Sequence, residues 1–222
     1  PLQFGPDEDL EHYPRTLQAD QQMLTSEGVD LLFTPDVVTM YPQGAHDSTV
    51  IDVPDVSQGL CNDFRPGHFT GVATVVARLF NLVQPDAALF GEKDYQQLAV
   101  IRRMVDDLGW PIEVVGVSTV RESDGLAMSS RNQYLGAEER RVAPMLYQTL
   151  CQLIGEVKTQ KKDYRTLENE AKEVLAQAGF IPEYVEIRHA DSLRPADPGE
   201  LNCVVLAAAR LGAARLIDNV RA

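Results

Sequence analysis

The sequence lacks several features that would assign it to common protein classes. No uninterrupted apolar run reaches the roughly 18 residues of a membrane span, and the first 15 residues contain no apolar signal core. The three cysteines, Cys61, Cys151 and Cys203, form no CxxC or Cys/His cluster of the zinc-binding kind. GxSxG and GxxxxGKS/T motifs are absent as well. We therefore expect a soluble, cytoplasmic protein with reduced thiols, without a serine-hydrolase elbow or a Walker loop.

Positive charge is also scarce. The sequence has 20 Lys and Arg residues against 33 Asp and Glu residues, which gives a net charge of −13. Such a charge opposes binding to nucleic acid or to an anionic membrane. A small anionic substrate is still compatible with it, because salt screens distant charges over about 8 Å and a few local cations then dominate.

Candidate metal ligands are few. The four histidines include no pair at ligand spacing: His12, His46, His68 and His189. His68 precedes an apolar helical pattern, and we interpret it as structural. Asp20 and the acidic residues 7–9 are oxygen ligands of the kind that Mg²⁺ accepts, although the acidic run is typical of a solvated loop. Asp20 is a weak candidate for a residue close to a bound Mg²⁺ ion.

The first half of the chain has the pattern of a parallel α/β sheet. With 222 residues and 44% hydrophobic composition, the chain is long enough for two modest domains. Apolar spacing predicts alternating strands and helices. The expected helices are 17–27, 67–83 and 95–108, and the expected strands are 29–33, 87–90 and 112–117.

The pattern changes beyond about residue 119. Asp124-Gly125 favours a tight hairpin turn, and two long helices and three strands follow. The expected helices are 137–159 and 164–178, and the expected strands are 184–188, 204–208 and 215–218. We predict a Rossmann-like nucleotide-binding domain over residues 1–119 and a smaller α+β domain over residues 120–222, with residues 191–199 as a connector inside the latter.

The first chemical motif is FGEKDYQQ at residues 90–97, between a predicted strand and a predicted helix. Ligands collect at the carboxyl ends of parallel strands, where a glycine lets backbone N–H groups approach a phosphate. Lys93 offers a charge for phosphate oxygens, and Asp94 can accept hydrogen bonds from ribose hydroxyls. The alternative is that Asp94 only caps the helix and Lys93 is a solvated charge.

The second motif is MSSRN at residues 128–132. Hydroxyls, backbone N–H groups and a forked guanidinium suit a triphosphate or a departing pyrophosphate. The alternative is a serine-rich helix cap. Together the two motifs favour an enzyme that closes over a nucleotide, because each would face the phosphates from a different domain.

Two glutamines form the third candidate. An amide both donates and accepts, so Gln3 and Gln97 could bracket a hydroxy acid through its hydroxyl and carboxylate. Either residue alone is more typical of a protein surface.

Six segments resemble the motifs of the pantothenate synthetase family. They are PLQFGPDEDLEHYPR at 1–15, YPQG at 41–44, RPGHFTGVATVVARLFNLVQPD at 65–86, FGEKDYQQ at 90–97, VRESDGLAMSSRNQYL at 120–135 and ARLGAARLIDN at 209–219. The resemblance implies an AMP-forming ligase: pantoate reacts with ATP to give pantoyl adenylate and pyrophosphate, and β-alanine then displaces AMP. It also implies ATP and Mg²⁺ as partners in catalysis, and a homodimer.

The resemblance also assigns residues. It implies that Gly91, Glu92, Lys93 and Asp94 line the ATP site, that Val120 contacts adenine through its backbone, and that Met128, Ser129, Ser130 and Arg131 form a mobile loop comparable to the KMSKS loop of class I aminoacyl-tRNA synthetases. Lys93, Ser129, Ser130 and Arg131 are the expected catalytic residues. Gln3 and Gln97 match the pantoate-binding glutamines, and Gln3 is also a candidate for β-alanine.

One family feature is not found in the sequence. The family begins with an MGxLHxGHxxL segment whose histidines bind phosphates, and no such segment occurs between Pro1 and Ala222. We expect that the natural protein continues upstream and that the chain as given is inactive in adenylation at a normal rate. Two alternatives stay open: a non-catalytic remnant that keeps the ligase fold, and another adenylate-forming nucleotidyltransferase with a different acceptor.

Overall fold

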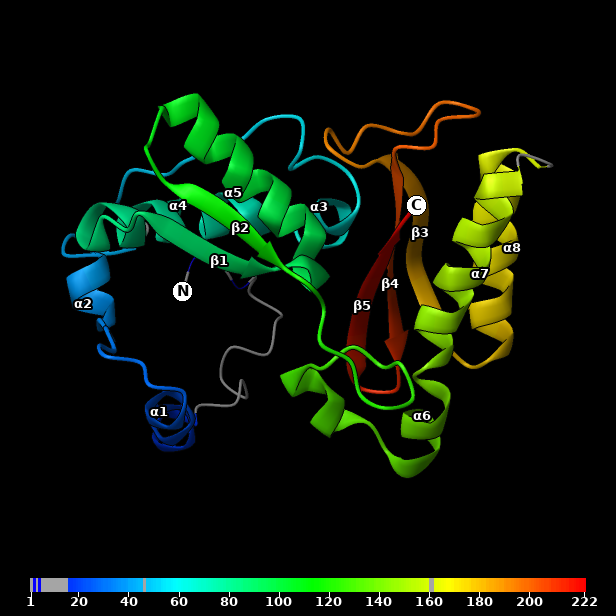
Figure 1. Ribbon diagram of the computed structural model, residues 1–222, viewed down its shortest axis with the longest axis horizontal. Coiled ribbons are helices and arrows are strands. Elements are labelled where there is room, and N and C mark those ends of the chain that lie inside the picture. Colours follow the sequence, from blue (N-terminus) through cyan, green and yellow to red (C-terminus); the bar gives the residue numbers. More distant parts are fainter. Residues whose placement is uncertain (1, 3, 5–15, 46, 160–161) are drawn as a thin grey trace.

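The computed structural model describes residues 2, 4, 16–45, 47–159 and 162–222. In these residues a parallel strand pair with helices lies beside a three-stranded antiparallel sheet, and two long helices cover the far face of that sheet (Figure 1). The predicted fold class, α/β with a parallel sheet and a smaller α+β part, is confirmed.

The first part contains the parallel pair. Strand β1 (Ala87–Gly91) pairs with β2 (Glu113–Val117). The helices are α1 (Leu17–Ser26), α2 (Val37–Met40), α3 (Cys61–Phe64), α4 (His68–Val83), α5 (Tyr95–Leu108) and the 3-10 turn η1 (Glu92–Asp94). A buried apolar face on α4 and α5 recurs at helical spacing, which is why both helices were predictable.

The strand predicted at residues 29–33 is wrong. The segment has no strand, and the Leu31 side chain is 83% exposed. A strand needs a hydrogen-bonded neighbour, and none of the described residues supplies a ladder to this segment. The prediction rested on apolar composition alone, which does not establish a strand.

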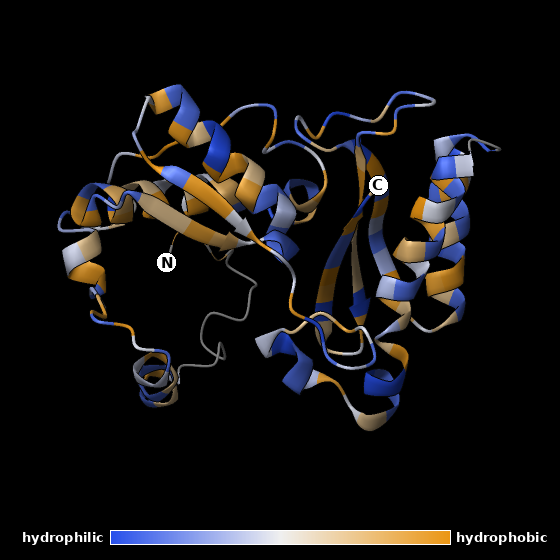
Figure 2. Cartoon of the chain, viewed as in Figure 1, coloured by the Kyte–Doolittle hydropathy of each residue, from blue (hydrophilic) through white to orange (hydrophobic). Residues whose placement is uncertain are grey.

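Strand β1 is also hydrophobic along its length (Figure 2), yet the Leu89 side chain is 66% exposed.

The second part contains the antiparallel sheet. Strands β3 (Ile181–His189), β4 (Cys203–Leu211) and β5 (Ala214–Arg221) pair in the order β3-β4-β5. The helices are η2 (Ser130–Tyr134), α6 (Ala137–Val142), α7 (Met145–Thr159) and α8 (Tyr164–Gln177). The single helix predicted over 137–159 is two helices, because Pro144 removes a backbone donor and its ring clashes with the preceding turn.

Strand β4 is buried on both faces. Val204 and Leu206 pack into the core that contains α4 and α5, whereas Val205 and Ala207 pack into the core of α7 and α8. Consecutive side chains of a strand point to opposite faces, so one strand serves two cores. The predicted domain boundary at 119/120 stays a prediction. One face of the antiparallel sheet packs against helices of the first part and the other face against helices of the second part.

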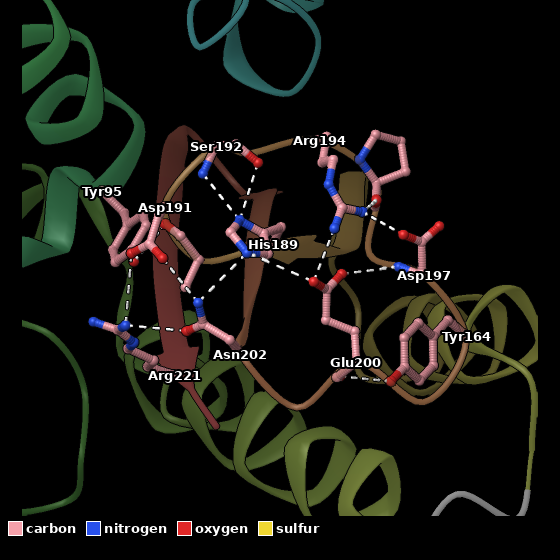
Figure 3. Close-up of polar contacts among 12 residues, drawn as sticks. Tyr95, Tyr164, His189, Asp191, Ser192, Arg194, Asp197, Glu200, Asn202 and Arg221 are labelled. Atoms are coloured by element: carbon pink, nitrogen blue, oxygen red, sulfur yellow. Dashed lines mark hydrogen bonds and ion pairs between the residues drawn. The ribbon is translucent and has the colours of Figure 1, made fainter.

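The connector between β3 and β4 is held by a polar network (Figure 3). The Ser192 backbone N–H donates to His189 Nδ1 at 3.2 Å, and Arg194 pairs with Glu200 at 2.8 Å. Tyr95 on α5 donates its hydroxyl to the Ala190 carbonyl at 2.9 Å. The connector was predicted as a loop, and these bonds give it a defined shape.

Two expectations from composition concern membrane-spanning helices and the state of the cysteines. No helix in the described part of the chain is long and apolar enough to cross a membrane. The three cysteines are free thiols, as predicted, with Cys61 and Cys203 buried and Cys151 partly buried.

Candidate functional site

A pocket of about 690 Å³ is lined by residues of both parts of the chain. From the first part come Lys93 and Asp94 of η1 and Gln97 of α5. From the second part come residues 128–131, which follow the hairpin. The two phosphate motifs identified in the sequence, although separated along the chain, therefore face the same cavity.

Lys93 is the cation on the first wall. Burial lowers the pKa of its ammonium, and the nearby carboxylates of Asp94 and Asp218 oppose that effect, while Arg131 and Arg121 lower the pKa further. Among the described residues Lys93 has no salt-bridge partner within 4.0 Å. A protonated lysine without an ion pair can form charge-assisted hydrogen bonds with a ligand that brings negative oxygens into the pocket.

The second wall is a turn held by its own side chains. Ser129 caps η2 by accepting a hydrogen bond from the Arg131 backbone N–H at 3.2 Å. Asn132 donates to Glu122 Oε1 and to the Ala127 carbonyl, both at 3.1 Å. The predicted hairpin at Asp124-Gly125 is confirmed, since the Glu122 and Leu126 backbones bond across it at 2.8 Å.

Hydroxyls and a guanidinium on this wall thus face Lys93 across the cavity. The sequence also offered the reading of a serine-rich cap. Ser129 does cap a short helix, but residues 129–131 line the pocket at the same time. The two interpretations are compatible for this turn.

Other predicted residues lie at different places. Gly91 ends β1, and Glu92 lines a neighbouring pocket of about 210 Å³ together with Thr119. Val120 is 63% exposed, and its carbonyl accepts from the Met128 backbone N–H at 2.9 Å. Asp20 lies on α1, outside the pocket lining, and accepts from the Thr16 hydroxyl at 3.1 Å. Gln3 and the acidic residues 7–9 lie outside the described residues, whereas Phe4 lines the large pocket.

Several lining residues were missed in the sequence. Arg65 and His68 line the pocket, with Arg65 Nη1 3.0 Å from His68 Nε2, and His68 is 8% exposed. Arg210 and Arg215 also line it, and both pair with Glu183, at 3.3 Å and 2.8 Å. All four lie in segments whose resemblance to the family was noted, RPGHF and ARLGAARLIDN, but neither spacing nor composition distinguishes them from surface residues.

The lining is strongly cationic despite the net charge of the chain. Among the described residues its lining includes the carboxylate of Asp94 and five cations, which are Lys93, Arg65, Arg131, Arg210 and Arg215. With Glu183, which pairs with Arg210 and Arg215, these described side chains carry a formal charge of 5 − 2 = +3 within a chain of −13. A pocket with these side chains can bind an anion with several phosphate groups.

Magnesium fits this arrangement only as an ion carried by phosphates. The described residues contain no group of three or more carboxylate, histidine or cysteine side chains at metal-binding distance. Mg²⁺ usually takes one or two protein carboxylates when substrate phosphates supply further oxygens. Asp94 is the carboxylate in the pocket lining that can serve such an ion.

The fold and the pocket define a class: an α/β protein with a pocket rich in Lys and Arg side chains at the carboxyl end of a parallel strand, lined also by a serine- and arginine-bearing turn. The sequence profile of the family described as Pantoate-beta-alanine ligase matches residues 1–221. The chain belongs to this family.

Relatives agree in sequence and in structure. A pantothenate synthetase from Azotobacter vinelandii is 59% identical over 220 residues, which are 99% of this chain and 78% of that protein. A pantothenate synthetase structure from Thermus thermophilus superimposes with a TM-score of 0.92 at 50% identity, covering 100% of this chain and 80% of that one. The ligase from Francisella tularensis, crystallised with a β-γ ATP compound and β-alanine, gives 0.80 at 31% identity over 100% of this chain and 76% of that one.

Proposed function

We infer that the protein catalyses the ATP-dependent condensation of pantoate with β-alanine to pantothenate. The family match and the ligand-bound relative support this function. The single observation that supports it in this chain is that Lys93 and residues 128–131, far apart in the sequence, line one pocket that is rich in Lys and Arg side chains.

We propose the following division of roles. A pantoate carboxylate oxygen attacks the α-phosphorus of ATP, the bond to the β-phosphate oxygen breaks, and pyrophosphate leaves. Lys93 and Arg131 neutralise the charge that develops on the phosphate oxygens, which is where catalysis of this kind gains most. Ser129 and Ser130 donate hydrogen bonds to the same group, and Asp94 accepts from the ribose.

In the second step the amine of β-alanine attacks the acyl carbon of pantoyl adenylate. The acyl C–O bond breaks, AMP leaves, and the amine nitrogen loses a proton as the amide forms. Gln97 is on the wall next to Asp94, where its amide can bind the pantoate hydroxyl and carboxylate. The role of Gln3 toward pantoate and β-alanine stays a prediction.

Further features implied by the family stay predictions in the same sense. They are Mg²⁺ bound with the ATP phosphates, with Asp20 as a weak candidate for its neighbourhood, a homodimer, a cytoplasmic location and a mobile 128–131 loop. Sedimentation velocity of the purified chain measures the oligomeric state, and a mass near 24.6 kDa would contradict the dimer.

The function is tested by the dependence of each product on each substrate. Pyrophosphate release from ATP should require pantoate, and AMP release should further require β-alanine. Pyrophosphate release that depends on another carboxylic acid would favour a different nucleotidyltransferase. No release under any of these conditions, measured with the full-length natural protein, would favour a non-catalytic remnant.

A further inference from the structure

Two consecutive residues of β5, Asp218 and Asn219, hold the 3-10 turn of the first motif and the hairpin that leads to the second motif. Side chains of neighbouring strand residues point to opposite faces of a sheet. Even-numbered Leu216 packs in the core of α7 and α8, whereas odd-numbered Ile217 packs against the core of α4 and α5. Asp218 and Asn219 therefore project toward different parts of the molecule.

Asn219 holds the first motif through its backbone. Its Nδ2 donates to the Glu92 carbonyl at 2.9 Å and to the Lys93 carbonyl at 3.0 Å. These carbonyls belong to the 3-10 turn η1 between β1 and α5. One amide group thus fixes the backbone from which the Lys93 side chain enters the pocket.

Asp218 holds the hairpin that leads to the second motif. It is 4% exposed and accepts two hydrogen bonds from Arg121, at 2.7 Å and 2.9 Å. Arg121 also donates to the Gly125 carbonyl at 3.1 Å, and its guanidinium lies 3.5 Å from the centre of the Tyr147 ring. A buried carboxylate with a bidentate arginine is a rigid attachment. Arg121 in turn bridges to Ala127, the residue before the Met128 turn.

We propose that Asp218 and Asn219 are positioning residues which set the separation of Lys93 from the Ser129–Arg131 turn across the pocket. Neither residue belongs to the lining of the large pocket, although both line a small cavity of about 40 Å³ that shares Lys93 and Asp94 with it. Their side chains bond to groups of the protein, which makes them positioning residues. The Asp218 Oδ1 also accepts from the Asn219 backbone N–H at 2.8 Å, so the two attachments share one short piece of strand. The inference rests on the proposed function.

The effect on catalysis follows from geometry. Adenylation needs donors on both walls to meet the same phosphate group, and a displacement of about 1 Å can cost about 100-fold in rate. Loss of the Asn219 amide leaves the Lys93 side chain chemically unchanged. It removes the two hydrogen bonds that hold the backbone of η1. The reaction then slows more than the binding of substrates weakens, because the missing contacts matter most in the transition state.

The test compares Asn219→Ala with Asn202→Ala in the full chain. Asn202 is a matched control, because its amide likewise makes polar contacts, with Asp191 at 2.8 Å, Arg221 at 3.2 Å and His189 at 3.5 Å, but away from the large pocket (Figure 3). The measurements are pantoate-dependent ATP–pyrophosphate exchange, affinity for a non-hydrolysable ATP analogue by calorimetry, thermal midpoint, and hydrogen exchange of residues 92–97.

We expect Asn219→Ala to lower kcat for exchange by about 10- to 100-fold, with KM for pantoate changed by less than about threefold. Hydrogen exchange in 92–97 should accelerate, and Asn219→Gln, which keeps the donor, should recover part of kcat. Asn202→Ala should match the unmodified chain in kcat. Equal kcat values for the two alanine variants would overturn the inference, as would a loss explained entirely by a lower thermal midpoint.

Failure of the proposed function gives a different pattern. If exchange depends on another carboxylic acid in place of pantoate, the ligase assignment is contradicted, and the calorimetric comparison then decides the inference alone. Weaker binding of the ATP analogue to Asn219→Ala than to Asn202→Ala would support positioning, and equal binding would overturn it.

Discussion

At the scale of single residues, Lys93 has the environment of a ligand-binding group more than that of a surface charge. It is mostly buried in the pocket wall, its pKa is lowered by that burial, and it has no salt-bridge partner within 4.0 Å among the described residues. A buried charge that makes no ion pair costs folding free energy, which is consistent with the phosphate-binding role proposed for Lys93.

Replacing Lys93 by Ala should reduce pantoate-dependent pyrophosphate exchange by about 100-fold or more, because a preorganised phosphate-binding group is lost. The fold should survive, since the side chain makes no ion pair in the described structure. Lys162→Ala is the control, because Lys162 is an exposed lysine paired with Glu170 at 2.7 Å. Exchange rates that fall equally in both variants would rule out the phosphate role of Lys93.

The pH dependence of nucleotide binding should report the loss of the proton from Lys93. Only the protonated amine attracts phosphate, and burial lowers the pKa of Lys93, so the amine loses its proton at a lower pH than an exposed lysine does. Affinity for an ATP analogue should be full below this pKa and should fall as pH rises through it.

Calorimetric titrations at several pH values measure this loss. Lys93→Arg keeps its charge over the same range, so its affinity should stay flat at alkaline pH. An equal alkaline loss in both proteins would assign the titration to another group.

The sequence predicted which side chains are suited to binding a phosphate better than it predicted which residues lie beside them. Lys93 and Arg131 were identified because they lie in motifs at the end of a strand and after a hairpin. His68 was interpreted as structural, yet it lies in the pocket wall beside Arg65. A histidine before a buried helix gives no signal of what faces it, because that depends on contacts between distant segments.

At the scale of elements, the β4–β5 hairpin turns at Gly212, which has φ +56°. A Cβ there would overlap the carboxylate of Glu139, which accepts from the Gly136 backbone N–H at 2.6 Å at the start of α6. Glycine is favoured here by the left-handed conformation, because the Glu139 carboxylate is the end of a flexible side chain that can move away from a Cβ.

Gly212→Ala should lower the free energy of unfolding by about 1–2 kcal/mol, because an L side chain is strained in the left-handed region. Gly155→Ala is the opposite case: Gly155 is exposed within α7, with no atom near its missing Cβ, so the change should stabilise by about 0.5–1 kcal/mol. Chemical denaturation of both variants measures the difference. A Gly212→Ala protein as stable as the unmodified chain would contradict this description of the turn.

Helices with one strong apolar face were predictable, and segments whose structure depends on a partner were not. Helices α4 and α5 match their predicted ranges because their periodicity is local information. Residues 29–33 are apolar but unpaired among the described residues, and pairing is information that the segment itself does not contain. Pro144 was a local signal for the break between α6 and α7. The prediction missed it because the apolar spacing continues across the proline.

At the scale of the whole molecule, strand β4 joins two cores. Leu206 is 4% exposed and packs into the core with α4 and α5, although its sequence position is in the second part. Trp110, the single tryptophan of the chain, packs against the same core. We therefore expect the two parts to unfold together.

Leu206→Ala should lower the free energy of unfolding by about 2–5 kcal/mol through a cavity in the shared core. Trp110 fluorescence and far-UV circular dichroism should shift by the same amount, because one cooperative transition involves both parts. A Trp110 midpoint that stays unchanged while the dichroism midpoint falls would contradict the coupling of the two cores.

The pocket itself is a property of the whole chain. The sequence predicted that two phosphate motifs would face each other from different parts, and Lys93 and Arg131 do line one cavity. It did not predict Arg210 and Arg215, whose guanidinium groups reach the pocket from β4 and β5. Their placement depends on how the antiparallel sheet packs against the first part, which no local pattern determines.

The location of the nucleotide tests the account most directly. A crystal structure of the chain with a non-hydrolysable ATP analogue should place phosphate oxygens within about 3.5 Å of Lys93 Nζ and of the Ser129–Arg131 turn. Ordered phosphates bound elsewhere, with both walls of this pocket uncontacted, would contradict the central claim.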